Sequence, residues 1–178
     1  MATLLIRPHP VICARRLVAA ALMAVTLGAC MSNPDTGKDA PLPVKSREDA
    51  QSWARQLTEH LAQAAGIQIN DEPVRPVFTS CVGKNGELAP DDRFNLGYAV
   101  HSNVPNAQHN EAIRKIRDLL KNEGLKIIDY RETAGGQPSA TVVARHPSSN
   151  YLVDVSSTAG NDRMVLGVDT PCLKPPPQ

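Results

Sequence analysis

The histidines of this chain are the residues best suited to acid–base or metal chemistry, but their spacing forms no established motif. A catalytic nucleophile needs a base within hydrogen-bond reach and a third group that orients this base. No Gly-x-Ser-x-Gly turn, His-Glu-x-x-His pair or phosphate-binding glycine loop accompanies the histidines. The sequence therefore predicts no catalytic residue, no metal site and no cofactor. The histidines that follow residue 29 are His60, His101, His109 and His146.

Several aspartates offer a possible pair of carboxylates. Asp91 is followed by Asp92, and Asp162 is close in sequence to Asp154 and Asp169. We place these residues in turns, where aspartate is favoured because its side chain bonds to the nearby backbone. Catalysis by two carboxylates depends on their separation in space, which the sequence does not give. A hydrolase that uses a carboxylate pair is therefore an alternative function.

The first 29 residues are organised as a secretory signal peptide. The basic pair Arg15-Arg16 precedes an uncharged apolar run over 17–29, and Ala29 is the small residue before a cleavage point. The run is much shorter than the ~20 apolar residues that a membrane-spanning helix needs. Adjacent arginines are also found in twin-arginine signals, so the export route stays open.

The four residues Leu27-Gly28-Ala29-Cys30 resemble the lipobox of bacterial lipoproteins. This resemblance implies that the Cys30 thiol receives a diacylglycerol and becomes the first residue of the mature chain. Residues 30–45 then form a polar tether that contains proline and glycine. We expect the membrane to be the partner of Cys30, on the outer (extracytoplasmic) face of the cell membrane. An ordinary cleaved signal peptide is the alternative.

Cleavage before Cys30 leaves 149 of the 178 residues, which is the size of one domain. It removes Arg7, Arg15 and Arg16 from the 19 basic residues, so 16 basic residues face 18 acidic ones and the net charge is −2. Nucleic-acid binding needs clustered Lys and Arg, and the chain has one Trp, three Tyr and two Phe for base stacking. This composition therefore argues against a nucleic-acid partner.

Two cysteines remain once Cys13 leaves with the signal and Cys30 is lipidated. Neither Cys81 nor Cys172 has a second Cys or a His nearby at zinc-ligand spacing. Disulfides persist outside the cytoplasm, so a single pair predicts a disulfide. This Cys81–Cys172 bond requires the first and last strands of the fold to lie near each other.

Two amphipathic helices are predicted. Ser46 and Asp49 form a capping box for a helix over Arg47–Ala65, and Gly66 ends it. Its apolar stripe has spacings of three and four, with the indole as a core anchor: Trp53, Leu57, Leu61, Ala64 and Ala65. The second helix begins near Pro105 and ends at Gly124. Its apolar face consists of Ala112, Ile113, Ile116, Leu119 and Leu120.

The domain covers residues 46–173. Outside the two helices, its sequence alternates between apolar and polar residues, as in β-strands separated by short turns. The candidate strands are residues 77–82, 94–101, 125–132, 140–146, 151–157 and 164–169, and a proline-rich tail over 174–178 follows. Tight turns favour antiparallel neighbours. The predicted fold class is α+β, with an antiparallel sheet of five to six strands and two helices packed on one face.

The mature chain as a whole is similar to small actinobacterial secreted lipoproteins. The features that carry this resemblance are the lipobox, the tether, the helix with its tryptophan, Ser80-Cys81, and the closing run Leu166 to Cys172. The second helix departs from the family because it has no large aromatic residue near its C-terminal end. The resemblance supports the disulfide and the envelope location, and it implies no activity.

These observations predict a function that involves no catalysis. We expect a lipid-anchored protein of the cell envelope whose domain is a non-catalytic binding or interaction module. One alternative is a hydrolase of the cell envelope that uses a carboxylate pair. The other is a carrier of lipid or another small ligand, which would show an apolar cavity between the helices and the sheet.

The lipobox resemblance generates the first prediction. Two acyl chains hold a protein firmly on a membrane, whereas one chain binds only marginally. Replacing Cys30→Ser should therefore move the protein from the membrane fraction to the soluble or unprocessed pool, as measured by fractionation and immunoblotting. A Cys30→Ser protein that is cleaved normally and stays on the membrane would contradict lipidation.

Overall fold

The computed structural model describes residues 42–133, 135 and 138–177. The proposed signal peptide, Cys30 and most of the proposed tether lie outside these residues. The described part consists of the following elements, in chain order: α1 (Arg47–Ala65), β1 (Val77–Ser80), β2 (Phe94–Asn103), the 3₁₀-helix η1 (Asn106–Gln108), α2 (His109–Asn122), β3 (Lys126–Thr133), β4 (Ser139–Arg145), β5 (Leu152–Ser157) and β6 (Arg163–Asp169).

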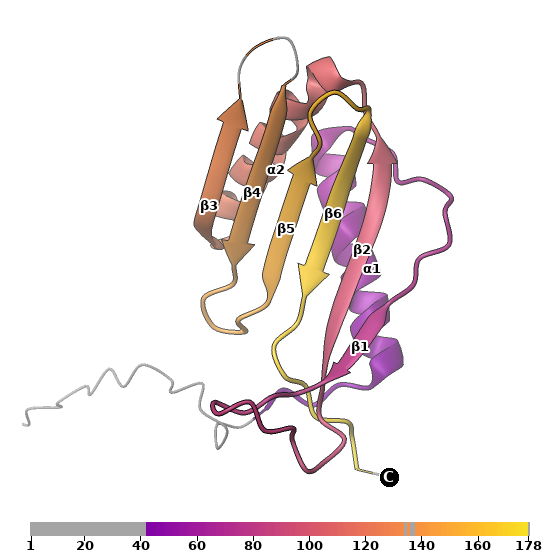
Figure 1. Cartoon of the computed structure of the whole chain (residues 1–178), viewed down its shortest axis with the longest axis vertical. Coiled ribbons are helices and arrows are strands. Elements are labelled where there is room, and N and C mark those ends of the chain that lie inside the picture. The colour runs from indigo at the N-terminus through magenta and orange to yellow at the C-terminus, as the bar shows by residue number, and fades with distance from the viewer. Residues whose placement is uncertain (1–41, 134, 136–137, 178) are drawn as a thin grey trace, which may run out of the picture. The chain divides into compact units, whose positions relative to one another are not determined.

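The strands form one antiparallel sheet, and both helices cover the same face of it (Figure 1). The predicted α+β class is therefore confirmed. The strand order is β1-β2-β6-β5-β4-β3, so the last strand of the chain lies inside the sheet, between β2 and β5. The expectation that the first and last strands are close neighbours needs a correction, because β2 lies between β1 and β6.

Helix α1 has the predicted bounds, but its buried face differs from the predicted one. The Ser46 hydroxyl accepts a hydrogen bond from the Asp49 N–H at 3.0 Å, and Gly66 ends the helix in the left-handed region at φ 72°. Mostly small side chains face the sheet: Ala50, Ala54, Thr58, Leu61, Ala62 and Ala65. Ala64 is exposed, contrary to the prediction, and Trp53 is only partly buried at the border of the core. Short side chains let this helix pack close to the sheet.

Helix α2 has the predicted apolar face. Its residues Ala112, Ile113, Ile116 and Leu120 are buried, while Leu119 is partly buried. The His109 ring is also buried, and its Nε2 lies 2.8 Å from the Val104 carbonyl oxygen.

The predicted Cys81–Cys172 disulfide is present, with its Cα atoms 5.9 Å apart. The tail after β6 makes this possible because Leu173 pairs with Phe94 at the start of β2 through backbone hydrogen bonds of 2.8 and 3.0 Å. The strand β1 pairs with β2 on its other side. The bond thus joins the two segments that flank β2. It encloses a loop of 91 residues, for which chain-entropy arguments give a stabilisation of up to about 4–5 kcal/mol.

The packing of α2 leads to a stability prediction. Ile116 is fully buried, so Ile116→Ala should lower the free energy of unfolding by about 2–5 kcal/mol. Lys115 is exposed and pairs with Glu111, so Lys115→Ala should change it by no more than about 0.5 kcal/mol. Denaturant titration of both variants checks this, and equal effects would contradict the observed helix orientation.

Candidate functional site

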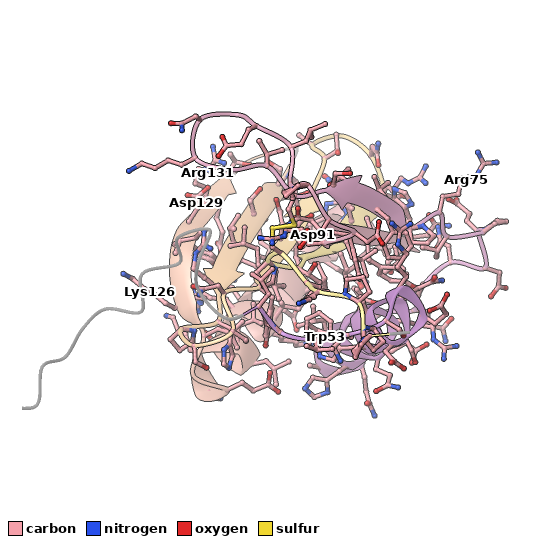
Figure 2. The ribbon with its side chains drawn as sticks, turned by 90° about the horizontal axis from the view of Figure 1, so that it is seen from below. Trp53, Arg75, Asp91, Lys126, Asp129 and Arg131 are labelled. Atoms are coloured by element: carbon pink, nitrogen blue, oxygen red, sulfur yellow. A yellow bond between two sulfur atoms is a disulfide. The ribbon has the colours of Figure 1, made fainter. Side chains whose placement is uncertain are left out.

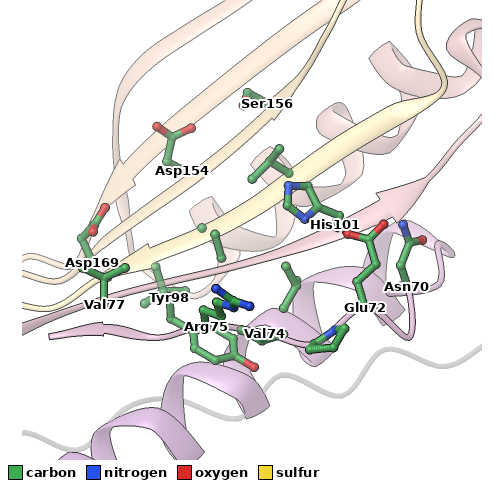
Figure 3. Close-up of a pocket in the computed structure, with 17 residues that line it drawn as sticks. Asn70, Glu72, Val74, Arg75, Val77, Tyr98, His101, Asp154, Ser156 and Asp169 are labelled. Carbon is green, nitrogen blue, oxygen red and sulfur yellow. Dashed lines mark ion pairs between the residues drawn. The ribbon is translucent and has the colours of Figure 1, made fainter.

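The face of the sheet that carries no helix contains a groove of about 580 Å³ (Figure 3). Its floor is formed by β2, β6 and β5, and its side wall by the segment that leads into β1. Ligand sites in proteins typically have volumes of about 300–1,000 Å³, so this groove has room for a small molecule or a short chain. It is the candidate functional site.

The floor of the groove is made of small residues because of how β2 and β6 are aligned. Gly97 pairs with Asp169, and Ala99 pairs with Gly167. A Cβ atom on Gly167 would lie 3.2 Å from the Asp154 carbonyl oxygen, and one on Gly97 would lie 3.3 Å from Oδ1 of Asp169. Both glycines therefore deepen the floor, and Gly97 leaves room for the Asp169 carboxylate.

The wall is a proline-containing segment held at both ends. The Asn70 N–H donates to the His101 carbonyl oxygen at 2.8 Å, and the Asn70 side chain accepts from the Asn103 N–H at 3.0 Å. At the other end, Val77 pairs with Gly97. The exposed Arg75 extends from this wall and makes no ion pair with another described residue.

Two carboxylates rise from the floor strands near one end of the groove. Asp154 pairs with Gly167, and Asp169 pairs with Leu152, so the two aspartates are diagonal neighbours on adjacent strands. Such neighbours are about 7–8 Å apart. Neither makes a hydrogen bond or ion pair with another described residue. Desolvation of its carboxyl, followed by the negative charges of Asp169 and Asp129, raises the pKa of the otherwise exposed Asp154.

The other end of the groove holds a network of opposite charges. The Glu72 carboxylate lies 2.8 Å from the Arg163 guanidinium and 3.7 Å from Nδ1 of His101. All three side chains are partly exposed, so each pair contributes little to stability. The groove therefore has a balanced end at Glu72 and an acidic end at Asp154 and Asp169, where the positive charge of Arg131 offsets the carboxylates only in part.

The aspartates named from the sequence do not all belong to this site. Asp154 and Asp169 lie in strands, so their placement in turns is wrong. Asp162 does lie in a turn, where it accepts the Asn106 N–H at 2.7 Å. Asp91 forms an ion pair with Arg93 in the loop between β1 and β2, and Asp92 is exposed in the same loop.

The histidines are spread over the fold. His101 lies at the groove, whereas His109 is the first residue of α2 and its ring is buried. His60 pairs with Glu123 at 2.6 Å, between the ends of the two helices. Nδ1 of His146 accepts the Ser149 N–H at 3.2 Å and lies 2.7 Å from its hydroxyl oxygen. The backbone bond shows that this histidine closes the turn between β4 and β5.

Two negative findings concern the described part of the chain. Within it, no group of three or more His, Cys, Asp and Glu side chains lies close enough together to hold a metal ion. None of its helices is both long enough and apolar enough to cross a membrane.

No family model, curated protein or solved structure matches this chain. A catalytic carboxylate pair needs groups that orient each carboxyl against the substrate. Asp154 and Asp169 have no such hydrogen-bond partners among the described residues, and their shared negative charge instead attracts a cation.

Sequence reasoning missed most of this site. Glu72, Arg75, Gly97 and Gly167 come from three separate segments, and only the strand register brings them together. A weak signal was present in the alternation of β2, where Gly97 and Ala99 occupy the positions between large apolar residues.

The raised pKa of Asp154 generates a prediction on pH and stability. The folded protein favours the protonated form of the Asp154 carboxyl. The protonated carboxyl therefore stabilises the fold fully below its ordinary pKa of 3.8, and this stabilisation is lost as the pH rises through the higher pKa of the folded state. Asp154→Asn mimics the protonated form at every pH. We expect it to raise Tm at pH 7, by less than about 4 °C because the site is exposed.

Thermal unfolding of both proteins between pH 3 and pH 7 checks this prediction. The difference in Tm between Asp154→Asn and the wild type should increase as the pH rises and should vanish at pH 3. Asp118→Asn on the opposite face serves as the control. A constant difference over this range would show that the asparagine acts through packing and not through charge.

Proposed function

We propose that this protein is a lipid-anchored binding module of the cell envelope and that the groove on the open sheet face binds its ligand. The observation that carries the proposal is the groove itself, a cleft of ligand size in which Asp154 and Asp169 have no hydrogen-bond or ion-pair partner among the described residues. The lipobox resemblance of residues 27–30 supports the location. The similarity to small actinobacterial secreted lipoproteins agrees with this location and adds no activity.

The charges of the groove favour a ligand with a cationic group. Two neighbouring carboxylates repel each other, and this repulsion contributes to the raised pKa of Asp154. A bound ammonium group would offset the repulsion and donate hydrogen bonds to both carboxylates. Arg75 on the wall offers the complementary contact for an acidic group elsewhere on the same ligand.

The shape of the groove favours an extended chain. Its floor follows β2 from Gly97 to His101, which corresponds to about 14 Å of strand. Four residues of an extended peptide span about 13–14 Å. The small side chains of the floor let such a chain approach the sheet closely. A short peptide with a free amino group therefore fits both the length and the charge of the site.

Tetra-alanine is a suitable probe for this proposal. We expect it to bind the mature chain, solubilised in a mild detergent, in isothermal titration calorimetry. Asp154→Asn and Asp169→Asn should each weaken binding at least tenfold, since a charge-assisted hydrogen bond contributes about 1.5–3 kcal/mol. Arg75→Ala should weaken binding of the free acid but not of the C-terminal amide.

Two controls make this experiment decisive. Glu59→Gln removes a carboxylate from α1 on the covered face and should leave binding unchanged. N-acetylated tetra-alanine, which has no ammonium group, should bind at least tenfold more weakly. Equal affinities for the free and acetylated peptides would contradict the proposed role of the acidic end. If the protein hydrolyses the peptide and Asp154→Asn abolishes this hydrolysis, the result would favour the carboxylate-pair hydrolase instead.

A further inference from the structure

Exposed apolar side chains gather at one end of the domain. Five large apolar residues are strongly exposed in the part of the chain that the structure describes, and Leu88, at 68%, is the most exposed of them. Three of these five, Val44, Val82 and Leu88, come from segments around the start of β2. Single exposed apolar residues are normal on a protein surface, but their concentration in one place indicates a contact surface.

Backbone pairing and the disulfide bring these segments together. Val44 pairs with Lys174, and Leu173 pairs with Phe94. The neighbouring Cys172 is bonded to Cys81, which directly precedes Val82. Figure 1 shows the loop after β1, the segment before α1 and the tail after β6 at the same end of the sheet.

Val82 and Leu88 are presented by a small, well-bonded hairpin. The two residues pair across an antiparallel bridge, so their side chains point to the same side. The Gly83 N–H donates to the Glu87 carbonyl oxygen at 2.7 Å, and the Asn85 N–H donates to the Glu87 carboxylate at 2.9 Å. These bonds and the disulfide hold the apolar pair outward in a defined position.

The same end carries an apolar cleft of about 200 Å³. Trp53 and Tyr151 line it, and their rings meet edge to face with centroids 5.0 Å apart. Pro171 and Leu173 of the tail form its other side. Figure 2 looks at the molecule from this end and shows Trp53 together with Asp91 of the loop after β1. Tryptophan and tyrosine are the residues enriched where a membrane meets water.

The start of the described chain lies at this end as well. Leu42 is two residues before Val44, and it is the twelfth residue after Cys30. Twelve residues span at most about 40–43 Å. A lipid anchor on Cys30 would therefore keep this end of the domain within that distance of the membrane and raise its effective concentration there.

We propose that this end of the domain docks on the lipid surface, with Val82 and Leu88 inserted between the lipid headgroups. The inference rests on the proposed lipid anchor at Cys30. Acidic and basic side chains are mixed at this end, so the contact is apolar and does not require anionic lipids. The charged residues there include Lys45, Arg47, Lys84, Glu87, Asp91, Asp92, Arg93 and Lys174.

Tryptophan substitution with quenching by brominated lipid tests the docking. Leu88→Trp places a reporter on the hairpin, and Ala159→Trp places a matched reporter in the exposed loop between β5 and β6, at the other end of the sheet. Both variants are prepared as the full lipidated chain in vesicles of phosphatidylcholine, with and without bromine on the acyl chains. The wild-type spectrum gives the contribution of Trp53, which is subtracted.

We expect brominated lipid to quench the added Leu88→Trp emission at least threefold more than that of Ala159→Trp, with no change at high salt. Equal quenching of the two reporters, in a protein that remains with the vesicles, would overturn the docking and leave the anchor intact. A protein that does not fractionate with membranes would overturn the anchor itself. A concentration-dependent blue shift of Leu88→Trp without quenching would assign this end to contact with a second copy and would also overturn the docking.

Discussion

The antiparallel pairing of β2 with β6 is the contact on which the rest of the structure depends. It joins seven residue pairs that lie 60 to 72 residues apart in sequence, from Asn103–Arg163 to Gly97–Asp169, so forming it costs loop-closure entropy. In return, it unites β1 and β2 with the meander of β3, β4 and β5 in a single sheet. It also brings the tail to Phe94, and with it Cys172 to Cys81. The disulfide therefore links two segments that the β2–β6 pair has already brought close together.

The same pairing determines the two faces of the sheet. Along β2, the large residues Leu96, Tyr98 and Val100 point to the helices, while Gly97 and Ala99 point to the open face. Strand residues alternate between faces with a period of two, so one sequence supplies both a core and a groove floor. A shift of one residue in the β2–β6 register would bury the small residues and expose the large ones. The groove is thus as well specified as the core.

Local sequence patterns predicted the elements of this fold because each element carries its own periodicity. The bounds of α1 follow from Ser46 and Gly66, and the apolar face of α2 follows from the spacing of Ala112 to Leu120. The Cys81–Cys172 bond followed from counting cysteines. The buried face of α1 was predicted less well, because alanines at the contact allow close packing while the large Trp53 lies at the border.

Local sequence patterns do not predict which strands that are far apart in sequence lie side by side in the sheet. Short turns correctly indicated the β3–β4, β4–β5 and β5–β6 neighbours, but no local feature indicates that β6 inserts beside β2. The candidate site depends on that insertion, since Asp169 meets Gly97, and Gly167 meets Ala99, only across this pair. Asp154 and Asp169 were named as carboxylates from the sequence, yet their relation as diagonal neighbours required the register of β5 and β6.

The proposed docking end and the groove together define how the site would face its surroundings. The groove runs along the strands, and its acidic end at Asp169 is the one nearer to the tail and the disulfide, because Thr170 to Leu173 follow directly. The Glu72–Arg163 end of the groove lies at the opposite end of the strands, where β2 ends at Asn103. With the hairpin of Val82 and Leu88 on the lipid surface, a bound chain would stand roughly along the membrane normal, its ammonium group toward the lipid. The open face itself would remain accessible from the side, which suits a module that captures ligands moving along the envelope.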